Sequence, residues 1–156
     1  MDRAIDMREL VSELSRRPRG RACVVLTHDY FDQKSWAAEL ARQTGMAHID
    51  LLDLFSENEE MGAKVSSFSI QDLFDFLQEQ DEFSVLIVSG IEFLKATWSA
   101  HSGSVEEFAS RVESWEKSPA LLFAMQFNSE LAERKFTARY RQYKFVVDQK
   151  DTLALI

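Results

Sequence analysis

The residues whose types and spacing are best suited to ligand chemistry lie in segment 28–35, which reads HDYFDQKS and follows an apolar run at 23–27. A phosphate-binding loop has the pattern G-x-x-x-x-G-K-[ST], because bare backbone N–H groups wrap the phosphate while the lysine and the hydroxyl complete the charge and metal contacts. Lys34 and Ser35 keep the last two places of that pattern. The segment therefore has the length and the ending of a loop that binds a nucleotide phosphate.

Both glycines of this pattern are absent. His28 and Gln33 stand in their places, and their side chains would crowd a nest that works by close approach of the backbone. Asp29 and Asp32 add two anionic groups where an anionic ligand would lie, and like charges repel more strongly as water is excluded. Asp32 is also a candidate N-cap of the following helix. We expect a loop that has kept its place in the fold and has lost phosphate binding.

The rest of the chain alternates short apolar runs, which predict buried strands, with amphipathic segments, which predict helices. The predicted strands are 22–27, 46–52, 83–88, 120–125 and 144–148. The predicted helices are 2–16, 33–44, 70–77, 105–115 and 129–136, with 56–67 as a loop and 152–155 as the second arm of a terminal hairpin. This alternation predicts an α/β three-layer fold with a mainly parallel central sheet of about five strands. We expect residues 1–156 to form one domain, in which 1–19 are an N-terminal amphipathic helix and basic turn.

Two helix boundaries have specific signals. Gly45 follows a segment rich in good helix formers and predicts a C-terminal stop. Ser69 and Asp72 resemble a capping box in which aspartate replaces glutamate, so the helix is expected to begin directly after Ser69.

The composition limits the compartment and the partners. With 46% hydrophobic and 12% aromatic residues, the 156 residues suffice for one buried core. A net charge of −8 argues against general binding of nucleic acids, which needs clustered Lys and Arg. The lone cysteine, Cys23, fits a reducing compartment, and no apolar run approaches the roughly 20 residues that cross a bilayer. We expect a cytoplasmic protein without a membrane partner.

In the order of its elements the chain resembles a P-loop NTPase of the AAA-like kind, from about residue 20 onward. In that family a strand ends in an aspartate that holds magnesium through water, with a catalytic glutamate close by, because magnesium prefers oxygen ligands. The matching strand, 85–88, is followed by Ser89, with Glu92 three residues later. A hydroxyl has no charge to balance the metal, so the second nucleotide motif is weakened as well.

The resemblance also implies a polar sensor residue after the next strand and an arginine that contacts a terminal phosphate. Gln126 and Asn128 occupy the sensor region, and capping of the following helix explains them equally well. The candidate arginines are Arg134, Arg139 and Arg141, and their spacing singles out none of them.

Length and layout are similar to those of the small P-loop proteins of bacterial phage-exclusion (BREX-type) systems. Because the order of elements is kept while both nucleotide motifs have lost their chemistry, we expect a catalytically inactive P-loop-like protein, a pseudo-ATPase without a cofactor, that serves as an interaction or scaffold subunit. The resemblance implies an anti-phage or DNA-handling complex as its setting. A protein partner is expected. Four residues would contact a nucleotide only if one binds: Lys34, Ser35, Ser89 and Glu92.

Two other functions stay open. One is an active NTPase with divergent motifs that uses Lys34, Ser35 and Glu92. The other is a nucleic-acid-binding adaptor, because segment 139–144 interleaves aromatic and basic side chains that can stack on bases and contact phosphates. Its basic residues are Arg139, Arg141 and Lys144. The alternative for that segment is that its tyrosines pack on the domain while the charges stay solvated.

Other chemistry is not supported. The histidines, His28, His48 and His101, are far apart, and with one cysteine they lack the spacing of a zinc site. A serine or cysteine nucleophile is not expected, because no elbow motif surrounds Ser89 and Cys23 lies in a predicted strand. A surface for docking another protein is expected around the mid-chain phenylalanines Phe55, Phe68, Phe74 and Phe76.

Overall fold

The central sheet of this computed structural model, which describes residues 4–136 and 143–155, has five parallel strands in the order β2-β3-β4-β1-β5. They are β1 (Ala22–Thr27), β2 (Ala47–Asp50), β3 (Val85–Ser89), β4 (Ala120–Gln126) and β5 (Val146–Asp148). In register, Val24 of β1 lies opposite Phe123 of β4 and Val146 of β5. Every residue of β1 and β3 is buried, as expected for strands covered on both faces. The predicted α/β fold with a parallel sheet is confirmed.

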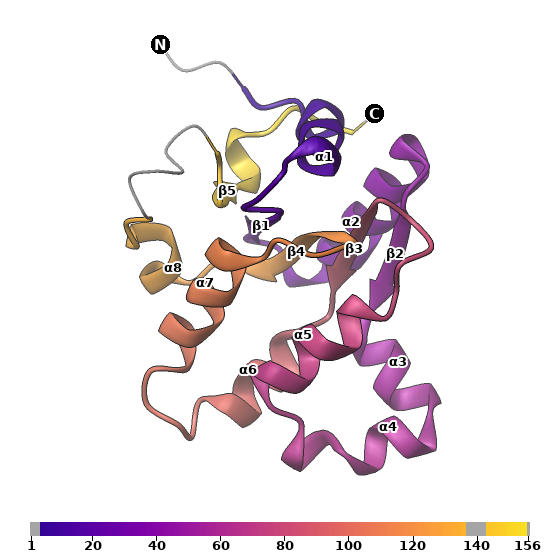
Figure 1. Cartoon of the computed structure of the whole chain (residues 1–156), viewed down its shortest axis with the longest axis vertical. Coiled ribbons are helices and arrows are strands. Elements are labelled where there is room, and N and C mark those ends of the chain that lie inside the picture. The colour runs from indigo at the N-terminus through magenta and orange to yellow at the C-terminus, as the bar shows by residue number, and fades with distance from the viewer. Residues whose placement is uncertain (1–3, 137–142, 156) are drawn as a thin grey trace.

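Helices cover both faces of the sheet, with α1 and α5–α7 on opposite sides of it (Figure 1). α1 (Met7–Arg16) and α2 (Tyr30–Thr44) pack on the face formed by alternate residues such as Val25 and Leu122. The opposite face includes Val24 and Phe123 and has an aromatic core, in which Phe123 lies 5.1 Å from Phe108 between ring centroids. The helical elements over this face are α3 (Leu51–Glu57), α4 (Glu59–Ala63), η1 (Val65–Ser67), α5 (Ile70–Gln78), α6 (Glu92–Trp98), α7 (Ser104–Ser114) and α8 (Ser129–Glu133).

Several expected boundaries are wrong, chiefly where short helices depend on caps instead of periodicity. Segment 56–67 is not a loop, because Asp50 and Asn58 cap α3 and α4 with their side chains. α6 was not expected. The terminal hairpin is replaced by a 3-10 turn, η3 (Gln149–Asp151), and by a parallel bridge between Ile5 and Thr152. The capping box of α5 and the stop at Gly45, which has φ +71°, are confirmed.

The expected docking surface of mid-chain phenylalanines is wrong. Phe55, Phe68 and Phe74 are buried, and Phe76 packs against the same core. Phe55, Phe68 and Phe74 therefore stabilise the fold and are not available to a partner, and Phe76 alone keeps a partly exposed surface. Within 4–136 and 143–155, no helix combines the length and the apolar character that crossing a bilayer requires.

The topology places one crevice at the carboxyl ends of β1 and β4. The chain leaves β1 through α2 on one face of the sheet, whereas it leaves β4 through α8 on the other face. Adjacent strands whose connections diverge in this way form the crevice in which open parallel sheets bind ligands. A ligand site is therefore expected among the residues at this edge of the sheet.

Candidate functional site

The connection between β1 and α2 is too short to wrap a phosphate. Only His28 and Asp29 separate Thr27 from the first helical residue, and the Asp29 carboxylate caps α2 by accepting the N–H of Phe31 at 3.0 Å. Beyond the first turn the N–H groups of an α-helix are bonded to the helix's own carbonyls. The expected loop at 28–35 is therefore wrong, and so is Asp32 as the N-cap, because an aspartate at 29 starts the helix earlier.

Lys34 and Ser35 lie on the exposed surface of α2. The ammonium of Lys34 forms an ion pair with the carboxylate of Asp53, and this hydrogen bond raises the pKa of Lys34. The hydroxyl of Ser35 donates to the carbonyl of Asp32 at 3.1 Å, one turn earlier in the helix. Both side chains thus have partners within the protein and none that belongs to the strand-end crevice.

Gln33 fills the crevice that a nucleotide would need. Its side chain is only 3% exposed, and its amide oxygen accepts the N–H of Gly90 at 3.0 Å. Its amide nitrogen donates to Oε1 of Glu92 at 3.0 Å and to the hydroxyl of Thr27 at 3.2 Å. One side chain of α2 therefore connects the ends of β1 and β3 and the beginning of α6.

The carboxylate of Glu92 completes this network, which we call the Gln33 network: Gln33, Thr27, Gly90, Glu92 and Gln126. Oε1 of Glu92 also accepts the backbone N–H of Gln126, and the hydroxyl of Thr27 donates to the carbonyl of Met125 at 3.1 Å. Oε2 of Glu92 is buried without a hydrogen-bond partner among the described residues. Two expected site residues, Glu92 and Gln126, are brought together here, but Gln126 contributes its backbone and not its side chain.

A second network joins β2 to β3 through Ser89, which is fully buried. The hydroxyl of Ser89 donates to Oδ2 of Asp50 at 2.8 Å, so its oxygen receives a hydrogen bond from Nε2 of His48, also at 2.8 Å. A catalytic serine requires the opposite polarity, in which the imidazole accepts the hydroxyl proton. Burial lowers the pKa of His48 despite the nearby Asp50. The trio is a structural clamp and does not activate Ser89 as a nucleophile.

Gly90 belongs to the Gln33 network, lies against Asp50 of the second network, and has no room for a side chain. It has φ +72°, and a Cβ atom would lie 2.7 Å from Oδ1 of Asp50. Its N–H is the donor to Gln33. The close approach of the Asp50 carboxylate therefore depends on glycine at this position.

The charges at this edge oppose an anionic ligand. The carboxylates of Asp29 and Asp32 lie within one helical turn, and their repulsion raises the pKa of Asp32. The carboxylate of Glu92 lies in the crevice itself. A triphosphate would therefore meet anions, with Lys34 held by Asp53 as the only expected cation of the motif.

His28 closes the outer side of the same edge. Its ring stacks on Phe127 at 5.1 Å between centroids, and its Nε2 lies 2.9 Å from Oδ1 of Asp148 at the end of β5. Burial is the largest single influence on the pKa of Asp148 and raises it, but the hydrogen bonds with His28 and with the N–H of Lys150, together with the charges of both residues, outweigh burial and leave this pKa below its usual value. His28 therefore links the ends of β1, β4 and β5 through contacts with protein groups.

Among the residues that the structure describes, the remaining expected site residues do not join the crevice. Asn128 caps α8 by accepting the N–H of Leu131 at 3.0 Å, which confirms the capping alternative. Arg134 pairs with Glu106, with N–O distances of 2.8 and 2.9 Å. Arg139 and Arg141 lie outside the described residues. Lys144 is exposed, and its neighbour Tyr143 packs beneath the guanidinium of Arg17 at 4.5 Å. The packing alternative thus holds for Tyr143, whereas Tyr140 lies outside the described residues.

The described part of the chain has neither a cluster of metal ligands nor a reactive thiol. No group of three or more His, Cys, Asp or Glu side chains that could hold a metal ion occurs among residues 4–136 and 143–155. Burial raises the pKa of the Cys23 thiol to about 12, so the reactive thiolate is suppressed.

Sequence reasoning missed the role of Gln33 and the clamp formed by His48, Ser89 and Asp50. The available signal was a polar residue, Ser89, that ends a continuous apolar run and must find partners when buried. The partners of Gln33 include a residue 59 positions away, which no local pattern indicates.

Comparison with known proteins adds no family. No protein-family model matches the chain, and no curated protein matches it. The geometry at the strand ends is therefore the observation from which a function is inferred.

We predict that Gln33→Ala lowers the free energy of unfolding by about 1–3 kcal/mol, because it leaves the N–H of Gly90 and the carboxylate of Glu92 without their buried partner. The measurement is urea denaturation followed by circular dichroism. Gln71→Ala is the matched control, since the exposed Gln71 bonds only to its helix neighbour Asp75, and a change within about 0.5 kcal/mol is expected. Equal effects of both variants would contradict the network.

Gly90→Ala should destabilise more than Gly45→Ala. Both glycines have a positive φ, which costs an L-residue about 1–2 kcal/mol, but an added Cβ at Gly45 meets no atom within 4 Å. At Gly90 the clash with Asp50 adds about 1–3 kcal/mol, the usual cost of overpacking. Paired thermal and urea unfolding of the two variants measures the difference. A Gly90→Ala protein as stable as Gly45→Ala would show that the Asp50 carboxylate does not approach so closely.

The contribution of the His28–Asp148 pair should depend on pH. The folded-state pKa of Asp148 is lowered, so its stabilisation is present above the unfolded value, about 3.9, and is lost as pH falls through the folded value. We expect Asp148→Asn to destabilise by less than about 1 kcal/mol at pH 7, and this difference from the wild type should shrink as pH falls below the unfolded value and through the lower folded one. Unfolding curves at a series of pH values test this. A difference that stays constant with pH would contradict the linkage.

Proposed function

We propose that the chain is a catalytically inactive, P-loop-like α/β domain that acts as an interaction or scaffold subunit. The observation that carries the proposal is the Gln33 network, in which an amide and a carboxylate of the protein occupy the crevice between β1 and β4. A domain whose own side chains fill its ligand crevice keeps its fold and its outer surface. The outer surface is then the part that remains available for function.

The resemblance to P-loop proteins draws support from the position of the β1–α2 unit. This unit stands beside the reversal of the strand order, where such folds place their phosphate loop. Loss of nucleotide binding draws support from three features: α2 begins at Tyr30, Lys34 is held by Asp53, and Ser89 replaces the metal-binding aspartate and is committed to Asp50.

The proposed setting follows from the resemblance to phage-exclusion proteins. We propose a cytoplasmic protein that binds another protein of an anti-phage or DNA-handling complex. A net charge of −8 favours a protein partner over direct contact with nucleic acid. Salt-sensitive binding of nucleic acid through Arg139, Arg141 and Lys144 would instead favour the adaptor alternative.

Titration of the purified protein with a fluorescent ATP analogue and Mg²⁺ tests the loss of nucleotide binding. We expect no saturable change in anisotropy up to about 1 mM, a limit that corresponds to about 4 kcal/mol of binding free energy. Lys34→Ala serves as the motif control and should behave as the wild type does. Binding that requires Mg²⁺ and is lost in Lys34→Ala would reject the proposal and support the divergent NTPase.

A further inference from the structure

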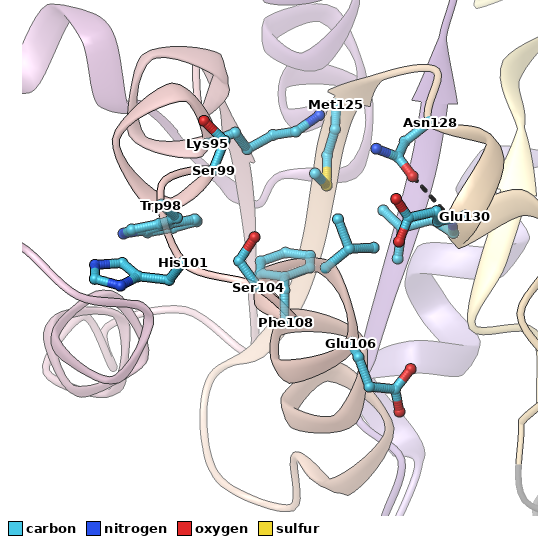
Figure 2. A pocket seen from close by; sticks show the side chains of 13 residues that line it. Lys95, Trp98, Ser99, His101, Ser104, Glu106, Phe108, Met125, Asn128 and Glu130 are labelled. Carbon is cyan, nitrogen blue, oxygen red and sulfur yellow. Dashed lines mark hydrogen bonds between the residues drawn. The ribbon is translucent and has the colours of Figure 1, made fainter.

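A cavity of about 410 Å³ lies on the face of the sheet covered by α6, α7 and α8, beside the end of β4 (Figure 2). Its volume lies within the range of pockets that bind small molecules. None of its lining residues belongs to the Gln33 network, so it is a separate site.

The inner wall of the cavity is apolar. Trp98, Phe108, Met125 and Leu131 line it, and each is at most 6% exposed. The indole N–H of Trp98 is already bonded to the carbonyl of Phe68 at 2.8 Å, so the indole contributes an apolar surface. These side chains suit the hydrocarbon or aromatic part of a ligand.

Two hydrogen-bond donors line the cavity, Lys95 from α6 and Asn128 from the start of α8. Figure 2 shows the ammonium of Lys95 and the amide of Asn128 on either side of Met125. The ammonium of Lys95 has no ion pair or hydrogen bond among the described residues, and partial burial lowers its pKa although Glu92 opposes this. The oxygen of Asn128 is occupied by the N–H of Leu131, which leaves its NH₂ group as a donor. Such a pair of donors fits a carboxylate.

The acidic side chains of the cavity differ in their availability. Glu106 is held in a two-point contact by Arg134, at 2.8 and 2.9 Å. Glu130 has no such partner among the described residues, and Figure 2 shows its carboxylate below Asn128, on the cavity side. An isolated carboxylate at this place would repel a simple organic acid, but it complements a ligand that also has an ammonium group.

We propose that this cavity binds a free α-amino acid with a large apolar side chain. The carboxylate of the amino acid bonds to Lys95 and Asn128, its ammonium pairs with Glu130, and its side chain packs on Trp98, Phe108 and Met125. The site discriminates against peptides, because a residue within a chain lacks both charges and a terminal residue lacks one of them. This binding site is independent of the proposed scaffold function, since neither requires the other.

Titration of the full chain with L-phenylalanine, followed by the NMR signal of the Met125 methyl group and by calorimetry, tests the proposal. We expect saturable binding in the micromolar to low-millimolar range. Affinity should fall at least about tenfold for 3-phenylpropionate, which lacks the ammonium, and for phenethylamine, which lacks the carboxylate, as expected when a charge-assisted hydrogen bond is lost. L-leucine, L-methionine and L-tryptophan test the tolerance of the apolar wall.

Three variants probe the polar groups separately. Lys95→Met removes the cation with similar volume, Asn128→Asp keeps the helix cap and replaces the donor with an anion, and Glu130→Gln removes the anion. Each should weaken L-phenylalanine at least about tenfold, whereas Lys64→Met, on an exposed lysine of another surface, should not. Circular dichroism and melting curves confirm that each variant is folded, and if one is not, the other two still decide.

Some outcomes overturn the proposal. They are no binding of any of the four amino acids up to about 10 mM, equal binding of L-phenylalanine and its two truncated analogues, and unchanged affinity in the folded variants. The ATP titration on the same samples keeps this result separate from the proposed function: nucleotide binding with intact amino-acid binding would reject only the scaffold hypothesis.

Discussion

The structure depends on satisfying the polar groups that a parallel sheet buries at the carboxyl ends of its strands. Gln33 does this for three elements at once, and each of its bonds replaces one that water would otherwise make. Its position explains how it can do so. Side chains of a helix lean toward the helix N-terminus, so a residue in the first turn of α2 points back to the strand ends. The cap at Asp29 and the buried amide are therefore one arrangement, because the early start of α2 places Gln33 over the crevice.

The same constraint explains why carboxylates are tolerated inside this edge. Asp50 accepts hydrogen bonds from Ser89 and from the N–H of Asp53, and Glu92 accepts them from Gln33 and Gln126. Donors supplied by the protein thus hold the negative charges where a phosphate would need the donors for itself. Gly90 lies between the two groups and allows both to approach the end of β3.

The sequence predicts the parts of this fold in which the hydrophobic pattern of a whole element agrees with the local signals at its ends. Runs such as 85–88 and 120–125 are short and apolar without interruption, and such runs are typical of strands buried on both faces. The start of α2 is mispredicted because the Lys34-Ser35 pair suggests a loop, whereas Asp29 provides a better cap. α3 and α4 are missed because they are short and are defined by Asp50 and Asn58. The Gln33 network and the cavity at Lys95 join distant segments, and no local spacing encodes such contacts.

The lengths of the strands have a consequence for assembly. The outermost strands, β2 and β5, have four and three residues, whereas the inner strands β1 and β4 have six and seven. Rims this short present few unpaired main-chain groups, so they offer a poor template for an incoming strand. A second molecule therefore does not readily extend the sheet by adding a strand, and this protects the protein from fibrous self-association. Contacts with other molecules are therefore made by side chains, and the identity of these side chains can distinguish one binding partner from another.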